Sequence, residues 1–466
     1  MTLRHLCAAT SAALALAAAA QAQVPAGETA HEPLSFEAAR IRYHAEADIL
    51  KADDAEVARA RHEADAAKWL GGPKVDVTAM QVEGTKTLDL SLDLPPSLSG
   101  VAGQLGLPSS LSLSDKMDIG GPRAYVSAVW PIYTGGAISA QKNALNAKAM
   151  EAEASRDARA VQKDAELAMK YWQAQLMKSI SALRESALAD EEEAVRRALG
   201  FEKTGMISKI ERMSVEVSRD AAKRALTAAK TDEHVADTEL INALRLPALP
   251  PLSTPLFVLK GELGTLDEWL ERADRQSPVV RQIDEQRKQA DQGVEAAKSR
   301  FEPQVFAFGM KNMIKHYLTL PEPDWIAGVG VKFTLWDNRD RFASLHAAQS
   351  LSDKASAAKN EARNEVRNAV EVAYLRAQQA RDEYRLSASQ VALAQENLKA
   401  RQASFAEGLS TAIDVSQART LLVGAQIAER AAAFKFVAGW AMLHAAAGDM
   451  PGFVNSLSRS DLEAVD

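Results

Sequence analysis

Two long stretches of this chain contain neither proline nor glycine, and they constrain the fold more than any other feature. One covers residues 137–199 and the other covers residues 339–407. As α-helices, rising 1.5 Å per residue, each would be about 100 Å long. No compact domain needs helices of that length. The choices are a coiled coil, a helical array or a membrane-associated tube.

The second stretch has the pattern of a supercoiled helix. Its small and apolar residues follow a strict 4,3 spacing at Val366, Val370, Ala373, Ala377, Ala380, Tyr384, Ser387, Val391, Ala394 and Leu398. A period of 3.5 residues predicts a seam that faces other helices along its whole length. Alanine supplies much of the chain's 47% hydrophobic content, while aromatic residues make up only 6%. A seam that contains many alanines and other small residues allows neighbouring helices to approach closely.

Each long helix is followed by a glycine turn and a second helix. Gly205 and Gly408 interrupt the pattern, and Ser208 and Ser410 follow as helix-capping residues. The second helices are expected to end near residues 246 and 447, before prolines and glycine. The sequence therefore predicts two helical hairpins, at about 134–246 and 337–447.

Strands with two-residue alternation precede each hairpin. They are predicted at about 74–83 and 122–133, and again at about 304–310 and 326–336. Each has one apolar face opposite a mixed face, as a strand between lipid and an aqueous lumen requires. A strand of a β-sandwich has the same alternation, so periodicity alone does not decide between a membrane barrel and a sandwich. The insert at 84–121 is rich in Leu, Ser, Gly and Pro and is predicted to be a loop.

The same order of elements occurs twice. Lys68 and Pro73 correspond to Lys298 and Pro303, and Gly205 corresponds to Gly408. We expect a signal peptide at 1–22, a first repeat at 23–250, a second at 251–448 and a C-terminal tail at 449–466. Cys7, the single cysteine, would be removed with the signal peptide, which leaves no disulfide.

Composition and motifs exclude several classes of function. The net charge of −7 provides no electrostatic footprint for nucleic acid. Phosphate-binding loops and the common hydrolase motifs are missing, so the sequence predicts no enzyme and no cofactor. His234 with Asp237 has no third ligand and is interpreted as a surface pair rather than a metal site. Met310, Met313 and His316 fit an apolar rim better than a copper site.

Five short motifs, in this order, resemble the TolC-like outer-membrane efflux protein family. They are Leu-Ser-Phe-Glu-Ala at 34–38, Lys-x4-Pro at 68–73 and 298–303, Pro-Ile-Tyr-Thr-Gly-Gly at 131–136, Gly-Met-Ile-Ser at 205–208 and Gly-Leu-Ser at 408–410. The second strand-to-helix junction, at 335–339, lacks the glycine pair of the first.

The resemblance implies a mainly α-helical protein with a small β part. Two tandem helix–strand–strand–helical-hairpin repeats would form, as a homotrimer, a 12-stranded outer-membrane β-barrel on a periplasmic α-helical barrel. It implies a passive exit channel in the outer membrane of a Gram-negative bacterium, with a large periplasmic portion. The channel would dock a periplasmic adaptor and an RND or ABC transporter of the inner membrane, and export small molecules. A type I protein secretion channel is the alternative, and a secreted coiled-coil scaffold is the alternative from a different class.

Three groups of residues are candidates for function. The adaptor-docking tips, which are otherwise plain helix connections, comprise Thr204, Gly205, Met206, Ser208, Gly408, Leu409, Ser410 and Thr411. The residues of a candidate periplasmic gate are Asp190, Glu193, Glu396, Lys399 and Arg401. For the two acidic residues of the helical run 190–193 the alternative is a solvated helix face. For the other three it is pairing of Glu396 with Lys399 or Arg401. The membrane-interface aromatics, which could instead cap a packed sheet edge, are Trp69, Trp130, Tyr133, Trp325 and Trp336.

Overall fold

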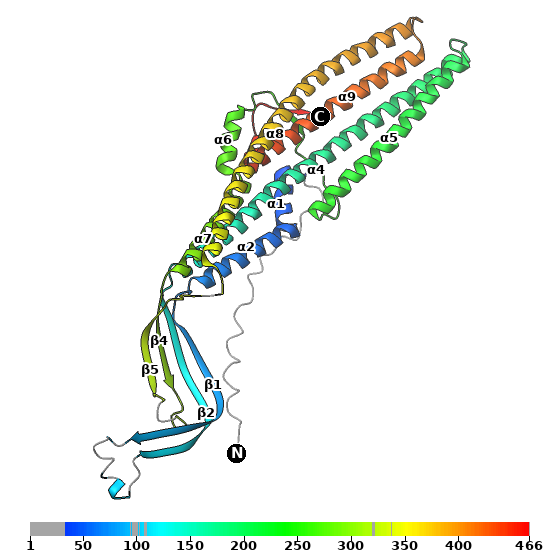
Figure 1. Cartoon of the computed structure of the whole chain (residues 1–466). Coiled ribbons are helices and arrows are strands. Elements are labelled where there is room, and N and C mark those ends of the chain that lie inside the picture. The colour runs from blue at the N-terminus through cyan, green and yellow to red at the C-terminus, as the bar shows by residue number, and fades with distance from the viewer. Residues whose placement is uncertain are drawn as a thin grey trace, which may run out of the picture.

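The chain is elongated, with a bundle of long helices at one end and a β-sheet at the other (Figure 1). A computed structural model describes residues 33–93, 95, 101, 103–106, 110–318, 322–336 and 338–465. The predicted signal peptide at 1–22 lies outside these residues. No helix in the described part of the chain combines the length and the apolar composition needed to cross a membrane.

Four long helices form two hairpins that lie side by side (Figure 1). The first hairpin is α4 (Ala137–Lys203) with α5 (Lys209–Leu244), and the second is α8 (Arg341–Ala406) with α9 (Ala412–Ala446). Shorter helices pack along them. These are α1 (Phe36–Glu46), α2 (Asp48–Ala67), α6 (Leu266–Gln276), α7 (Pro278–Lys298), the 3₁₀ turn η1 (Ser299–Phe301) and α10 (Met450–Ser456).

The predicted heptad seam of α8 is the inner face of its helix. All ten seam positions are buried or half-buried, and Val370 and Ala377 are completely inaccessible to solvent. A Cβ on Gly439 of α9 would lie only 3.2 Å from the Cα atom of Ala377. Because the facing side chains are small, the backbones of α8 and α9 come close to direct contact here.

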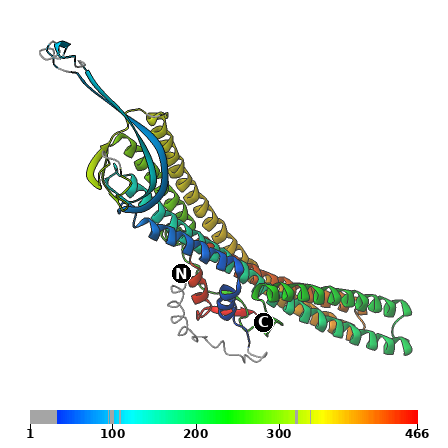
Figure 2. The ribbon, with the colours of Figure 1, turned by 90° about the horizontal axis from the view of Figure 1, so that it is seen from below.

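The main sheet has four antiparallel strands in the order β1-β2-β4-β5. They are β1 (Lys74–Asp93), β2 (Ser110–Tyr133), β4 (Gln304–Asn312) and β5 (Trp325–Lys332). The pairing of β2 with β4 joins the two repeats into one sheet. Seen from below, this sheet is strongly curved (Figure 2).

The insert at 84–121 is not simply a loop, as the sequence had suggested. β1 and β2 stay paired through it, from Gly84 opposite Ile119 to Asp93 opposite Ser110. The signal was present, because leucine alternates with Thr, Asp and Ser from 87 to 93, which is a strand period. Its high Ser, Gly and Pro content obscured that alternation. In the second repeat the strand is shorter than expected, since β5 ends at Lys332 rather than near 336.

A mixed core lies halfway along the helices. There β3 (Leu256–Leu259) pairs with β6 (Leu462–Val465), so part of the segment expected to be a tail, 449–466, belongs to this core. The Tyr171 hydroxyl donates to the carbonyl of Leu34 at 2.7 Å, and the Trp172 indole donates to the carbonyl of Pro255 at 3.0 Å. The core joins both hairpins, since it includes Trp172 of α4 and Trp440 of α9.

Candidate functional site

The tip of the first hairpin is a tight turn with helix caps on both sides. Gly205 takes φ +76°, a left-handed conformation that suits glycine, directly after α4 ends. Ser208 and Glu211 then form a capping box at the start of α5, with the Ser208 hydroxyl accepting from the Glu211 amide at 3.2 Å. The turn is therefore followed by a capped helix and presents Met206 to solvent.

The tip of the second hairpin repeats this construction 203 residues later. Gly408 has φ +77°, and Thr411 forms a capping box with Asp414 at the start of α9. Hydrogen bonds from the backbone and hydroxyl of Thr411 and from Ser410 lower the pKa of the Asp414 carboxyl. Leu409 is exposed at the end of the turn, as Met206 is at the other tip.

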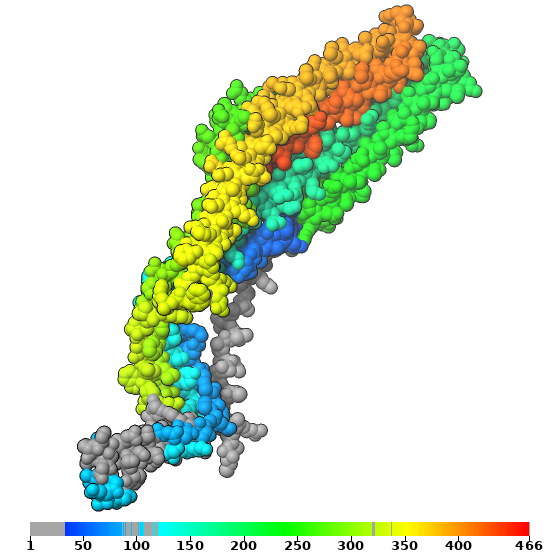
Figure 3. Space-filling view, viewed as in Figure 1, coloured from blue at the N-terminus to red at the C-terminus, as the bar shows by residue number. Residues whose placement is uncertain are grey.

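A groove of about 770 Å³ lies between the two tips. Its floor is apolar, and the rings of Phe201 and Phe405 meet there edge to face with centroids 6.0 Å apart. Its rim is polar and includes Arg197, Gln402 and Asp414. The tips lie next to each other at the far end of the molecule (Figure 3). An apolar floor with a polar rim is the surface on which an amphipathic helix can pack.

A buried polar contact links the hairpins just behind this groove. Glu191 of α4 accepts hydrogen bonds from the Ser416 hydroxyl at 2.9 Å and from Arg419 at 3.0 Å, both on α9. The second carboxylate oxygen of Glu191 has no hydrogen-bond partner in the described structure. The sequence carries no signal for Ser416 and Arg419, and Glu191 belongs to the acidic run 190–193, in which only Asp190 and Glu193 are predicted gate residues.

The five predicted gate residues lie on the surface around this contact. Asp190 is exposed and its carboxylate is 3.8 Å from the Arg419 Nε atom. Glu193 pairs with Arg196 at 2.6 Å, and Glu396 pairs with Lys399 at 2.8 Å, all of them exposed. Arg401 is exposed as well. The structure thus brings Asp190 close to the buried link, whereas the others lie in local surface pairs or alone.

The register of the main sheet sorts its residues onto two faces. We call one the apolar face. It contains Val75, Val77, Ala79, Ala124, Val126, Ala128, Trp130, Val305, Ala307, Gly309, Ala327, Val329 and Val331, and reaches Lys311 at one end. The other, the mixed face, contains Lys74, Asp76, Thr78, Tyr125, Ser127, Gln304, Phe306, Phe308, Gly328, Gly330 and Lys332. Val77 and Val329 are 75% and 68% exposed, so the described residues leave both edges of the apolar face uncovered.

The predicted aromatic residues lie at the two ends of the main sheet. Trp69, Trp130, Tyr133 and Trp336 are near the helical end of the sheet, and Trp325 is at the opposite end, paired with Lys311. All five are exposed, and the Trp130 indole donates to the carbonyl of Gly71 at 2.9 Å. Two aromatic levels that border an apolar band are typical of a sheet that lies in lipid.

The residues that the structure describes contain no group of three or more His, Cys, Asp or Glu side chains that could hold an ion.

Comparison with known proteins gives a family match for the second repeat. Residues 269–449 match the model of the outer membrane efflux protein family. No curated protein sequence matches the chain.

Solved structures match nearly the whole chain. The open-state MtrE outer membrane channel of Neisseria gonorrhoeae is 18% identical, with a TM-score of 0.67 over 89% of each chain. The outer membrane protein VceC of Vibrio cholerae is 14% identical, with a TM-score of 0.71 over 89% of this chain and 96% of its own. The CmeC outer membrane channel of Campylobacter jejuni is 13% identical, with a TM-score of 0.70 over 92% and 90%.

At these identities the solved structures establish only the fold of the chain, which is mainly helical with a small sheet part. The chain contains an outer membrane efflux protein family domain at residues 269–449, and nearly its whole length has the fold of TolC-like outer membrane channels.

Proposed function

We propose that three copies of this chain form a 12-stranded barrel on a helical tunnel, and that this trimer is the exit channel of a tripartite efflux pump. The observation that carries the proposal is the open four-stranded sheet. Within the described residues β1 pairs only with β2 and β5 only with β4, so both edges expose backbone hydrogen-bonding groups. In lipid such edges are too costly, and pairing with the neighbouring copies removes them.

The helical part supports the same assembly. Leu375, Leu386 and Leu393 of α8 are all more than half exposed, although they lie on a long apolar-seamed helix. Neighbouring copies of the hairpins would cover them. The mixed face of the sheet would then line the barrel, and the apolar face would contact lipid.

Cysteine crosslinking tests the trimer directly. Val77 lies on one edge strand and Val329 on the other, both on the apolar face. With Val77→Cys and Val329→Cys in one chain, a flexible bismaleimide should give two- and three-chain products in outer-membrane fractions. Each single variant is the control, because its cysteines lie on the same edge of every copy and should not be bridged. A monomer that stays in the soluble periplasmic fraction would refute the proposal.

The tips would dock the helical hairpin of a periplasmic adaptor, which in turn engages an RND or ABC transporter of the inner membrane. Support comes from the groove between the tips and from the exposed Met206 and Leu409 beside it. A photoreactive residue at position 410 should capture an adaptor in intact cells. Capture of a type I secretion adaptor instead of a pump adaptor would favour protein export over export of small molecules.

The periplasmic end would also be the gate. Opening would move the second hairpin away from the first, which breaks the contact of Arg419 with Glu191 and the ring contact of Phe201 with Phe405. Asp190 would contribute through its approach to Arg419. Glu193, Glu396, Lys399 and Arg401 would set the charge of the mouth.

A further inference from the structure

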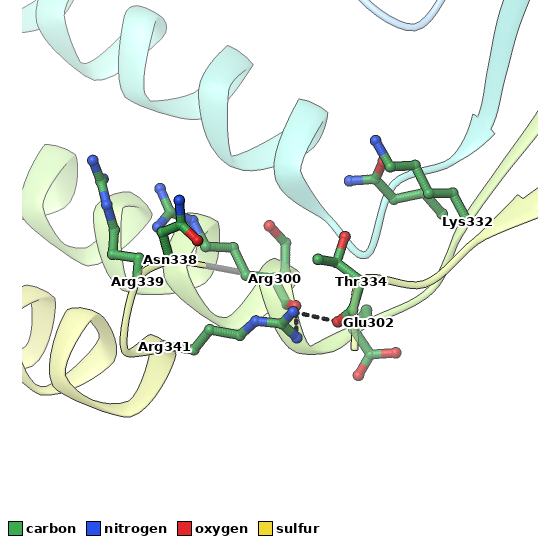
Figure 4. A pocket seen from close by; sticks show the side chains of 9 residues that line it. Arg300, Glu302, Lys332, Thr334, Asn338, Arg339 and Arg341 are labelled. Atoms are coloured by element: carbon green, nitrogen blue, oxygen red, sulfur yellow. Dashed lines mark hydrogen bonds between the residues drawn. The ribbon is translucent and has the colours of Figure 1, made fainter. Parts of the chain in front are cut away.

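The junction between the sheet and the helices of the second repeat contains a pocket with an excess of positive charge. The pocket measures about 500 Å³ and is lined by Ser299, Arg300, Glu302, Gln304, Lys332, Thr334, Asn338, Arg339 and Arg341. Four of these side chains are cationic and only Glu302 is acidic (Figure 4). The neighbouring Asp340 is already engaged, because it caps α8 by accepting from the Ala343 amide at 3.1 Å.

Two of the four cations are available for a ligand. The side chains of Arg300 and Lys332 are exposed, and neither has a hydrogen-bond or ion-pair partner among the described residues. Arg341 has a structural role. It donates to the backbone carbonyl of Arg300 at 3.2 Å and to that of Thr334, which ties η1 to the segment after β5 (Figure 4). Arg341 therefore ties two backbone segments of the pocket together, while the side chains of Arg300 and Lys332 stay exposed among its lining residues.

The matching junction of the first repeat has fewer cations. A pocket of about 510 Å³ lies there, and its two cations are both engaged. Lys68 pairs with Asp65 at 2.6 Å, and Lys142 donates to the carbonyl of Lys68 at 2.9 Å. The two pockets are nearly equal in size, so the second differs by its larger number of cations and by the two that have no partner among the described residues.

The register places the charge on the mixed face of the sheet. Lys332 is paired with Gln304, and both belong to the face that would line the barrel. In the trimer, three such pockets would form a ring where the barrel meets the helical tunnel. Rings of Arg and Lys side chains in a confined pore attract and select anions.

We propose that this pocket is a binding site for the phosphate or carboxylate group of an anionic molecule in the channel, and that it makes the junction selective for anions. The inference rests on the proposed trimer and names a substrate class for it. A phospholipid headgroup has the same chemistry. The mixed-face position of Lys332 favours the aqueous lumen as the source of the anion.

Titration with inorganic pyrophosphate tests the site in full-length, detergent-purified protein. The double variant Arg300→Gln, Lys332→Gln should weaken binding by about tenfold or more, since two charged contacts are lost. Lys311→Gln is the matched control, because Lys311 carries the same charge on the same pair of strands but on the apolar face. Equal binding by the double variant and the control would overturn the proposal. This measurement does not require an open channel or a trimer.

Planar-bilayer recordings test the selectivity. The wild-type channel should prefer chloride to potassium, and the double variant should lose most of that preference while Lys311→Gln keeps it. Absence of any conductance from the wild type would count against the proposed channel, whereas the pyrophosphate result would stand by itself. A third arm compares phosphatidylglycerol with phosphatidylcholine vesicles. If phosphatidylglycerol alone abolishes pyrophosphate binding, a lipid headgroup occupies the site and the assignment to the lumen is wrong.

Discussion

Arg419 of α9 donates a hydrogen bond to Glu191 of α4 across 3.0 Å, and the two residues are only 6% and 4% exposed. They belong to different repeats and lie 228 residues apart. A buried charge pair contributes little net stability, but removing one partner leaves the other charge buried without a counter-charge, which is costly. The contact is therefore a strong constraint on how the two hairpin tips sit together.

Arg419→Ala should loosen the tips. It leaves Glu191 buried with only Ser416 as a partner, which typically costs about 3–5 kcal/mol. We expect faster amide hydrogen exchange and faster proteolysis near the tips than in the wild type. Arg196→Ala is the control, since its exposed pair with Glu193 should contribute at most about 1 kcal/mol. Similar exchange rates in the two variants would show that the buried link does not hold the tips.

The sequence places candidate gate residues on the right helix, but they are Asp190 and Glu193 of the acidic run 190–193 rather than Glu191. The residues buried near the tip of α4 are Glu191, Val195 and Ala198. One residue is about 100° on a helix, which is enough to turn Asp190 outward and Glu191 inward. The phase depends on packing against α9, which local sequence does not encode.

Met206→Glu should abolish capture of the adaptor without unfolding the protein. Met206 is exposed at the tip and lines the groove, so a charge there would be buried on docking. Val235→Glu is the control, because Val235 is an exposed apolar residue of α5 far from the tips. Pull-down through the photoreactive residue at position 410 measures the effect. Equal loss in both variants would indicate a general defect rather than a docking site.

Adjacent residues of β1 test which face of the sheet meets lipid. Val77 lies on the apolar face and Thr78 on the mixed face. Val77→Arg should cost about 2–4 kcal/mol if it lies near the bilayer midplane and should deplete heat-resistant trimers from the membrane fraction. Thr78→Arg should be tolerated, because it would face the aqueous lumen. If both variants assemble equally well, the apolar face is not a lipid surface.

The two glycines of the first junction should respond differently to substitution. Gly135 and Gly136 both have positive φ, at +63° and +90°. A Cβ on Gly135 would lie 2.5 Å from the Cβ of Glu302 and 2.8 Å from the carbonyl of Ser299, whereas one on Gly136 would meet nothing. We expect Gly136→Ala to cost about 1–2 kcal/mol for its backbone alone and Gly135→Ala to cost more. Equal thermal shifts would mean that the contact with η1 adds no constraint.

The elements themselves were largely predictable, but the middle of the molecule was not. Stretches free of proline and glycine, ended by Gly205 and Gly408, define the long helices, because nothing in them can interrupt a helix. β3 and β6 have only four residues each and pair across about 200 residues of sequence. No local period identifies such short strands. The core around Tyr171 and Trp172 could therefore be recognised only from the structure.

That core contains a buried histidine, and its titration predicts how stability depends on pH. His444 is enclosed by the rings of Trp269 and Trp440, with centroids 4.8 and 4.6 Å away. Its Nδ1 atom is 3.0 Å from the carbonyl of Asp449, and its Nε2 atom has no hydrogen-bond partner in the described structure. Burial lowers the pKa of His444 from 6.5 to about 4, because the charged ring would lose its hydration.

The folded state therefore binds the proton more weakly than the unfolded state, and stability should decrease as the pH falls from about 6.5 to about 4. The decrease from this group is about 3 kcal/mol, and it ends below pH 4 where both states are protonated. His444→Asn keeps a donor toward Asp449 but cannot titrate, so its thermal midpoint should change less over this range. His62→Asn, at an exposed position of α2, should keep the wild-type slope. A slope unchanged in His444→Asn would assign the acid sensitivity to other groups.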